Sequence, residues 1–299
     1  MRGNSYGLLE IHVAVLLFGL SGLFGKFLSL PPSVIVWGRT FFASVALGLT
    51  LVCLRQSLRI RSKNDLGILI LLGGILSTHW TTFFHSIQIS TVAVGLITFS
   101  TFPVFVTFME PFFFQEKFRV FDILTATLVF CGLILVIPSF DFDNHISRGA
   151  LWGTLSGFTF AVLSMLNRRY VRLYSPLVIT FYQNVFATLI LLPFLLTNSR
   201  SIGSKDLVLL ALLGVFCTAL SHGLFIKGLR YVRAQLASVT AGLEPVYGVL
   251  FAFLFLGEIP SLRIALGGII ILGTTVLAST KMRNNDKKTS IVSNSGLCK

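Results

Sequence analysis

Ten apolar segments, each roughly long enough to cross a lipid bilayer, constrain this chain of 299 residues more than any other feature. A spanning helix needs about 20 apolar residues, because the hydrocarbon layer offers its backbone no water to bond. The segments cover approximately residues 8–28, 33–54, 66–88, 91–113, 119–137, 149–167, 176–197, 206–228, 234–256 and 261–279. Only short polar connections separate them. The sequence therefore predicts an all-α integral membrane protein with ten transmembrane helices.

The composition agrees with this class and argues against a nucleic-acid partner. Hydrophobic residues make up 54% of the chain and charged residues 12%, whereas soluble domains are about 25% charged. The net charge is +13, but the basic residues sit in short loops and form no basic surface with interleaved aromatic rings. The four cysteines have neither metal nor disulfide spacing. We expect no metal and no cofactor.

The basic residues predict how the chain is oriented. With the N-terminus in the cytoplasm, 18 of the 24 Lys and Arg residues fall on the cytoplasmic side, five fall outside and Arg39 lies within a segment. Cytoplasmic loops carry an excess of positive residues. We therefore expect both termini in the cytoplasm, in a multi-pass cell membrane protein such as one of a bacterial inner membrane.

The sequence repeats itself across its two halves. Pro103 is followed thirteen residues later by Glu116, and Pro245 is followed thirteen residues later by Glu258, so both pairs are 142 residues apart. Similar matches occur at neighbouring offsets, and each half holds five segments. Because five is odd, the two halves must lie upside down relative to each other.

This duplication predicts three regions. Residues 1–140 and 141–280 are expected to form two inverted five-helix repeats, and residues 281–299 a disordered, basic cytoplasmic tail. Inverted repeats are typical of secondary transporters, which bind their substrate near the midplane of the bilayer between the repeats.

Several local features together resemble the EamA-type transporters of the drug/metabolite transporter superfamily. They are Phe18-Gly19 with Lys26, Arg39, Pro103 with Glu116, Arg168-Arg169, and Leu243-Glu244-Pro245 with Gly257-Glu258. The resemblance covers about residues 8 to 280, and Gln115 departs from it because the family usually has glycine there. It implies ten helices around a central cavity, lined mainly by segments 1, 3, 4, 6, 8 and 9, and the transport of small metabolites.

Glu244 is the strongest candidate for a substrate-binding residue. It lies inside an apolar segment, where a charge is costly and usually has a function or a specific partner. Burial favours the neutral form of a carboxyl group, so Glu244 is a candidate to carry a proton or to bind a substrate amino group. The alternative is a protonated acid that only hydrogen-bonds a neighbouring helix. Its counterpart in the first half is Phe102, which is neutral, so the duplication does not account for this acid.

Polar side chains form stripes on three of the segments that the resemblance assigns to the cavity. The stripes are Thr78, Thr81, Thr82, His85 and Gln88; Thr218, Ser221 and His222; and Thr240, Glu244 and Tyr247. Spacings of three, four, seven and ten residues place each set on one helical face. The predicted substrate-binding residues are Glu244, Tyr247, Thr240, His222, Ser221, Thr218, Thr81, His85, Trp80 and Phe99. The alternative is that the hydroxyl groups bond carbonyls of their own helices, and that the histidines are structural donors. For Trp80 and Phe99, which could stack on an aromatic substrate, the alternative is bulk in the core or against lipid.

Four other charged residues have structural interpretations. We interpret Arg39 as a residue that pairs within the protein or extends outward to lipid phosphate, with the binding of an anionic substrate group as the alternative. Lys26 is expected to anchor the membrane interface. Glu116 and Glu258 follow the ends of segments and are expected to fix loops through hydrogen bonds or helix caps.

The sequence thus predicts a secondary active transporter rather than an enzyme. Its expected partners are the lipid bilayer and a small organic metabolite, such as an amino acid or a related amine-bearing or cofactor-like compound, and coupling to a proton or an exchanged solute is left open. One alternative is an intramembrane serine protease, because Gly19-Leu20-Ser21-Gly22 matches the G-x-S-G form of rhomboid enzymes. Ser21 would then need a histidine within hydrogen-bond reach. The other alternative is a scaffold or receptor that transports nothing.

Overall fold

The protein is all-α wherever the computed structural model describes it. The described residues are 2–114, 120–137, 143–171, 173–198, 200–228, 231, 240–274 and 276–277. No strand occurs among them, which confirms the predicted class. The tail, Gln115 and Glu116 lie outside the described residues.

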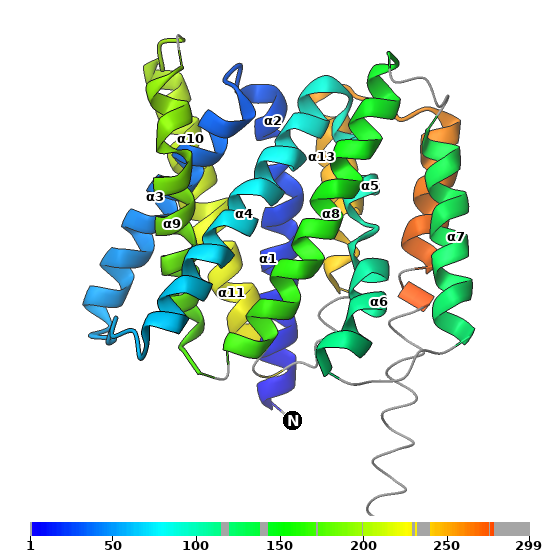
Figure 1. The fold of residues 1–299 in the computed structure, drawn as a ribbon. Coiled ribbons are helices and arrows are strands. Elements are labelled where there is room, and N and C mark those ends of the chain that lie inside the picture. Colours follow the sequence, from blue (N-terminus) through cyan, green and yellow to red (C-terminus); the bar gives the residue numbers. More distant parts are fainter. Residues whose placement is uncertain are drawn as a thin grey trace, which may run out of the picture.

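The helices are arranged side by side across the molecule (Figure 1). In chain order they are α1 (Arg2–Ser21), α2 (Phe24–Phe27), α3 (Pro32–Cys53), α4 (Lys63–Ile89), α5 (Val92–Phe99), α6 (Phe102–Phe114), α7 (Val120–Val136), α8 (His145–Tyr170), α9 (Pro176–Leu196), α10 (Ser204–Gly214), the π-helix η1 (Val215–Leu220), α11 (Ser221–Gly228), α13 (Glu244–Leu256) and a last helix over Leu262–Thr274. Among the described residues, six helical stretches are long and apolar enough to cross a membrane, and four shorter apolar helices accompany them. The chain is a multi-pass membrane protein.

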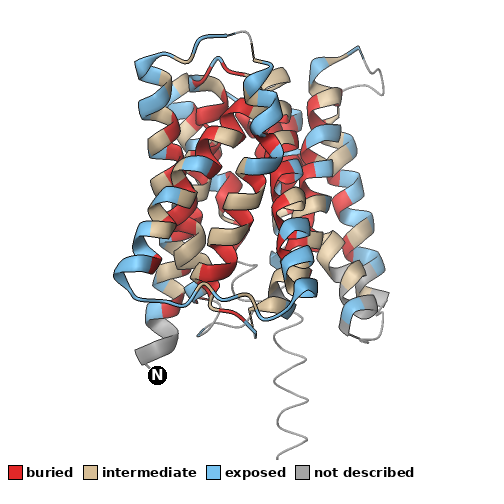
Figure 2. Cartoon of the chain, turned by 60° about the vertical axis from the view of Figure 1, so that its left-hand side comes forward, coloured by how far each residue is buried: buried red, intermediate tan, exposed pale blue. Residues whose placement is uncertain are grey.

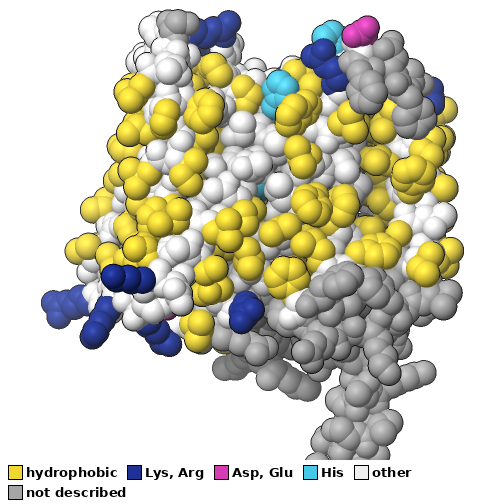
Figure 3. Space-filling model, viewed as in Figure 1, with side chains coloured by type: hydrophobic (Ala, Val, Ile, Leu, Met, Phe, Trp, Pro, Cys, Tyr) yellow, Lys and Arg dark blue, Asp and Glu magenta, His cyan; other side chains and the backbone are white. Residues whose placement is uncertain are grey.

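The surface matches a bilayer environment. Buried residues concentrate on the faces that the helices turn toward one another, and exposed residues on the outer faces (Figure 2). In the view of Figure 3, hydrophobic side chains cover the middle of the molecule, while Lys and Arg gather at its two ends. Large apolar side chains such as Leu49 and Phe255 are more than half exposed. In a membrane, these side chains contact lipid.

Local sequence signals explain where several helices begin. Pro32 and Pro176 open α3 and α9, where a proline costs no hydrogen bond because the first backbone N–H groups of a helix have no intrahelical partner. Ser62 caps α4, and Thr91 caps α5 by accepting a hydrogen bond from a backbone N–H group of the first turn. The N-terminal ends of these helices are therefore fixed by the sequence nearby.

The strongest packing joins the two halves of the chain rather than neighbours within one half. Helix α4 packs on α8 and α9, α3 packs on α9, and α1 packs on α11. The contacts come in reciprocal pairs: α1 of the first half packs on α11 and α13, and α8 of the second half packs on α4, α5 and α6. Helices that occupy the same position in the two sequence repeats thus pack against corresponding helices of the opposite half.

Two glycines show the same reciprocity at atomic detail. A Cβ atom at Gly73 of α4 would lie 3.1 Å from the carbonyl oxygen of Gln183 in α9. A Cβ atom at Gly214 of α10 would lie 2.7 Å from the carbonyl oxygen of Arg39 in α3. Gly73 and Gly214 are 141 residues apart, and Arg39 and Gln183 are 144 apart, close to the 142 residues that separate the two Pro/Glu pairs of the repeat. Small residues allow both helix pairs to approach closely.

Three segments that the sequence predicts as continuous helices are interrupted. Turns occur at residues 22–23, 100–101 and 242–243. The last two are 142 residues apart, and each lies just before the proline of the repeat, Pro103 or Pro245. Non-helical backbone at membrane depth is tolerated where it is buried in protein or lines a cavity.

Candidate functional site

A small cavity lies among the three helix interruptions. Its lining residues are Phe18, Ser21, Arg39, His79, Trp80, Phe83, Phe99, Phe160, His222 and Glu244. They come from α1, α3, α4, α5, α8, α11 and α13, and hence from both halves of the chain. The volume is about 30 Å³, close to that of one water molecule in the liquid.

Four of the residues that the sequence nominates line this cavity: Glu244, His222, Trp80 and Phe99. Thr218 and Ser221 are buried but do not line the cavity. The hydroxyl group of Ser221 donates to the carbonyl oxygen of Thr218 over 3.4 Å. The second stripe thus contributes His222 to the cavity wall.

The polar stripe on α4 lies about half a turn away from the cavity. His79, Trp80 and Phe83 form the cavity face of this helix, and at 100° per residue the position of Thr81 is opposite to them. His85 packs its ring edge-on against Trp152 of α8, with 5.1 Å between the ring centroids. The structure therefore places Thr81 and His85 outside the cavity wall.

The stripe predicted around Glu244 is divided by the turn at residues 242–243. Thr240 is buried before the turn, and Tyr247 is half-buried behind it. The Cβ atom of Tyr247 faces Gly19 of α1, and neither Thr240 nor Tyr247 is among the lining residues. Glu244, expected near the middle of a helix, is the first residue of α13.

Arg39 is the residue that the sequence interpretation underestimated. It does not extend to the lipid: only 1% of its surface is exposed. Its Nε donates to the hydroxyl oxygen of Thr218 over 3.0 Å, and its Nη2 donates to the carbonyl oxygen of Cys217 over 3.3 Å. Its guanidinium carbon lies 3.7 Å from the ring centroid of Trp80, a cation–π geometry. The predicted pairing within the protein is correct, and the same residue also lines the cavity.

The π-helix η1 supplies both of these partners. Thr218 donates its own hydroxyl hydrogen to the carbonyl oxygen of Leu213 over 2.9 Å, which leaves its oxygen free to accept from Arg39. The wide π turn also leaves the carbonyl oxygen of Cys217 able to accept from the guanidinium group. Single π turns inside α-helices are frequent at functional sites. Here the turn fixes Arg39.

Glu244 faces Arg39 across the cavity without touching it. The two groups interact electrostatically, but no ion pair or hydrogen bond joins them within the described part of the chain. Glu244 is 9% exposed, and none of the described side chains hydrogen-bonds its carboxyl group. A carboxyl group and a guanidinium group thus line one small cavity, each able to meet a ligand.

Two histidines complete the polar part of the wall. The Nδ1 atom of His79 lies 2.9 Å from Oγ of Ser156, and Ser156 donates to the carbonyl oxygen of His79 over 3.1 Å. His222 lies between Phe18 and Trp80, with ring centroids 4.9 and 5.2 Å away. No hydrogen bond of the His222 ring occurs among the described residues. His79 was not among the nominated residues, because it lies off the polar stripe of α4.

Ser21 also lines the cavity, at the end of α1. The described residues include no hydrogen bond between its hydroxyl group and a histidine, although His79 and His222 share the wall. A serine nucleophile needs such a base. The geometry gives the protease interpretation no support.

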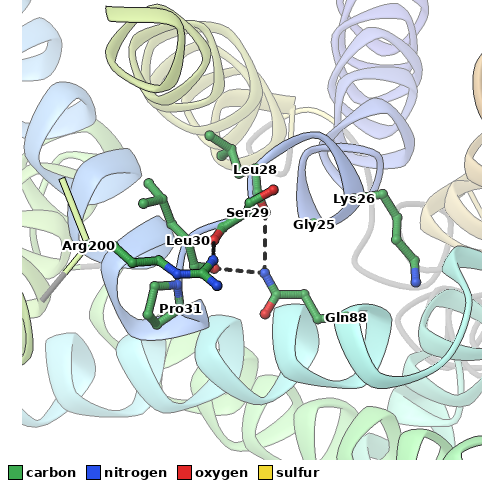
Figure 4. A pocket seen from close by; sticks show the side chains of 8 residues that line it. All are labelled: Gly25, Lys26, Leu28, Ser29, Leu30, Pro31, Gln88 and Arg200. Carbon is green, nitrogen blue, oxygen red and sulfur yellow. Dashed lines mark hydrogen bonds between the residues drawn. The ribbon is translucent and has the colours of Figure 1, made fainter. Parts of the chain in front are cut away.

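A larger and shallower pocket of about 390 Å³ lies at the end of the molecule opposite the N-terminus (Figures 1 and 4). Gln88 reaches across it to donate to the carbonyl oxygen of Leu30 over 2.8 Å, and Arg200 donates to the carbonyl oxygen of Ser29. Lys26, expected as an interfacial anchor, donates to the carbonyl oxygen of Ser90 over 2.7 Å. These bonds tie the α2–α3 connection to α4 and to the α9–α10 connection.

A bundle of apolar helices, packed half against half around a buried polar cavity with interrupted helices, is the architecture of a membrane transporter. The model of the EamA-like transporter family matches residues 5–137 and 147–280. The chain belongs to this family.

Individual relatives agree with this assignment. The chain is 24% identical over 291 residues to the uncharacterized transporter YxxF of Bacillus subtilis, covering 96% of this chain and 93% of the relative. It is 25% identical over 228 residues to the S-adenosylmethionine uptake transporter of Rickettsia conorii, covering 75% and 74%. A crystal structure of a protein at 19% identity covers 94% of this chain and 98% of its own, with a TM-score of 0.66, which supports the fold.

Proposed function

We propose that this protein is a secondary active transporter that moves a small amine-bearing metabolite, an amino acid or a related cofactor-like compound, by alternating access. The observation that carries the proposal is the carboxyl group of Glu244, which faces a cavity between the two halves and has no described hydrogen-bond partner. A buried acid of this kind attracts a cationic group of a ligand or a proton. Family membership supports transport, and Glu244 supports the class of substrate.

The name of one relative is compatible with this class of substrate. The Rickettsia conorii protein is named for the uptake of S-adenosylmethionine, a compound with an α-amino group. We propose the class of amine-bearing compounds, because the carboxyl group of Glu244 can recognise an amine.

Alternating access is supported by the size of the cavity. Pockets for small organic ligands usually measure about 300–1,000 Å³, whereas this cavity measures about 30 Å³. A metabolite can therefore bind only after the helices around the cavity move apart. The interruptions at residues 100–101 and 242–243 are places where helix segments can tilt without the loss of a continuous hydrogen-bond ladder.

We also propose the finer topology: ten crossings in two inverted repeats, residues 1–140 and 141–280, with both termini in the cytoplasm. The equivalent contacts of Gly73 and Gly214 support it, as does the distribution of basic residues. The test is labelling of single cysteines in intact cells. An impermeant reagent should label a cysteine introduced at Ser201 and should leave one introduced at Ser57 unlabelled, and the opposite pattern would refute the orientation.

The function is tested on the purified, full-length protein. Thermal unfolding is measured with each compound of a panel: the twenty amino acids, their decarboxylated amines, nucleosides and S-adenosylmethionine. A ligand that binds only the native state raises the unfolding midpoint. Uptake of each stabilising compound is then measured in proteoliposomes, where a transporter gives saturable flux and a scaffold or receptor gives none.

The variant Glu244→Gln keeps the shape of the side chain and removes its charge. We expect normal membrane insertion with loss of uptake, or loss of the pH dependence of uptake. The matched control is Glu10→Gln, because Glu10 pairs with Lys227 near the end of the bundle and is not a cavity residue. Uptake at the wild-type rate by the Glu244→Gln variant would refute the role of this acid.

A further inference from the structure

We infer that Arg39 forms a carboxylate-binding subsite in the cavity, so that the transported compound carries a carboxylate in addition to its amine. The inference rests on the proposed function for the identity of the cavity as the transport site. It makes Arg39 a residue that determines substrate specificity.

The first argument is the incomplete hydrogen bonding of the guanidinium group. Nε and Nη2 are bonded to Thr218 and Cys217, whereas Nη1 is buried without a partner. Buried polar groups are almost always hydrogen-bonded, and a buried charge without full pairing is costly. The unpaired Nη1 on a cavity-lining residue therefore indicates an acceptor that is supplied from outside the chain.

The second argument is that the guanidinium group is held in place for such an acceptor. The π-helix η1 binds Nε and Nη2 on one edge, and the ring of Trp80 covers one face at 3.7 Å. Phe84, which lies on α4 like Trp80, has its ring centroid 5.4 Å from the guanidinium carbon. A planar group fixed on one edge and one face presents its remaining N–H groups in a set direction, which suits a carboxylate.

The third argument is the separation of the two charges. Arg39 and Glu244 line the same cavity, but the described residues form no ion pair between them. A ligand that carries an amine and a carboxylate satisfies both groups at once. A ligand that carries only the amine leaves the guanidinium group unpaired, and a ligand that carries only the carboxylate does the same to Glu244. Sites that contain buried polar groups reject analogues that leave those groups unpaired.

The subsite is tested first on the wild-type protein with matched ligand pairs. The pairs are L-phenylalanine and phenethylamine, L-methionine and 3-(methylthio)propylamine, and S-adenosylmethionine and its decarboxylated form. Each pair differs only in the carboxylate. We expect the carboxylate-bearing member of at least one pair to bind roughly 100-fold more tightly than its partner or better, as judged from the concentration dependence of the unfolding midpoint.

The second test uses variants of Arg39. Arg39→Gln should abolish the preference for the carboxylate-bearing member, and Arg39→Lys should retain part of it because the charge remains. Arg263→Gln is the matched control, because Arg263 is exposed at the start of the last helix and should leave the preference unchanged. The ligand pairs need no variant, so an Arg39 substitution that fails to fold does not remove the test.

The outcomes separate this inference from the proposed function. Binding of a carboxylate-bearing compound without flux would support the subsite and refute secondary transport. Flux of an amine at the same efficiency as its carboxylate-bearing partner would support transport and refute the subsite. A panel in which no carboxylate stabilises the protein, or a carboxylate preference that survives Arg39→Gln, would also overturn the inference.

Discussion

Replacing Gly214 by alanine tests whether the close contact between α10 and α3 supports the site. A Cβ atom at this position would lie 2.6 Å from Cβ of Phe42, 2.7 Å from the carbonyl oxygen of Arg39 and 3.1 Å from the backbone nitrogen of Ala43. Two of these atoms belong to the backbone and cannot rotate away. The helices must separate, and overpacking of this kind costs about 1–3 kcal/mol. We expect Gly214→Ala to lower the unfolding midpoint by several degrees and to weaken ligand binding, because the backbone of Arg39 shifts.

Two further glycines make the experiment quantitative. Gly73→Ala meets Cβ of Phe186 at 2.5 Å and two backbone atoms of α9 at 3.0 and 3.1 Å, so it should cost a similar amount of stability. Gly67→Ala is the control: nothing lies within 4 Å of its Cβ position, and alanine is favoured over glycine in a helix by about 1 kcal/mol. Thermal unfolding in detergent, followed by tryptophan fluorescence, compares the three variants. A Gly214→Ala protein as stable as Gly67→Ala would refute the argument from close packing.

Three other outcomes follow from the bonds at the ends of the helices. Glu258→Ala should destabilise the protein by about 1 kcal/mol in thermal unfolding, because the carboxylate of Glu258 accepts from the backbone N–H group of Val92 over 2.9 Å and so caps α5. Glu258→Gln keeps an acceptor and should lose less stability. Tyr174→Phe should cost about 1–3 kcal/mol, because the tyrosine hydroxyl joins the connection before α4 to the start of that helix, and an unchanged midpoint would contradict this. The hydrogen bond and negative charge of Glu10 raise the pKa of Lys227. This pair should therefore stabilise the protein fully below the unfolded pKa of lysine, about 10.4, and lose its effect as the pH rises through the higher folded pKa. A Lys227→Met protein should lose less stability at alkaline pH than the wild type.

Most of the fold was predictable from the sequence because the bilayer leaves few choices. The lengths of the apolar segments predicted the helices, and prolines and capping residues mark where several of them begin. The prediction that Glu258 fixes a loop or cap is confirmed by its bond to Val92. The interruptions at residues 100–101 and 242–243 were not predicted. A proline indicates where a helix can start. It does not indicate whether the residues before it belong to the same helix or to a separate one.

The candidate site was predictable in part: Glu244, His222, Trp80 and Phe99 were nominated from the sequence and line the cavity. Glu244 stood out because an acid in an apolar segment has few structural explanations. Arg39 carried the same signal, seven residues after the start of α3, but a long cation can also extend to the lipid headgroups, and the sequence does not distinguish these outcomes. The stripe of hydroxyls on α4 does not line the cavity. Hydroxyl groups can also bond carbonyls of their own helix: Thr82 donates to the carbonyl oxygens of Thr78 and His79. Nothing in the sequence signals the π-helix that holds Arg39.

The packing of one half on the other has a consequence for biosynthesis. The faces of α3 and α4 that form the interior are covered by α9 and α8, which leave the ribosome later. The first helices therefore remain inserted in the membrane without these partners until the second half has been synthesised. Helix insertion and helix association are then separate stages, and assembly depends on contacts between distant parts of the chain. A cell that makes only residues 1–137 should degrade the product, whereas synthesis of the two halves as separate chains should yield the assembled bundle.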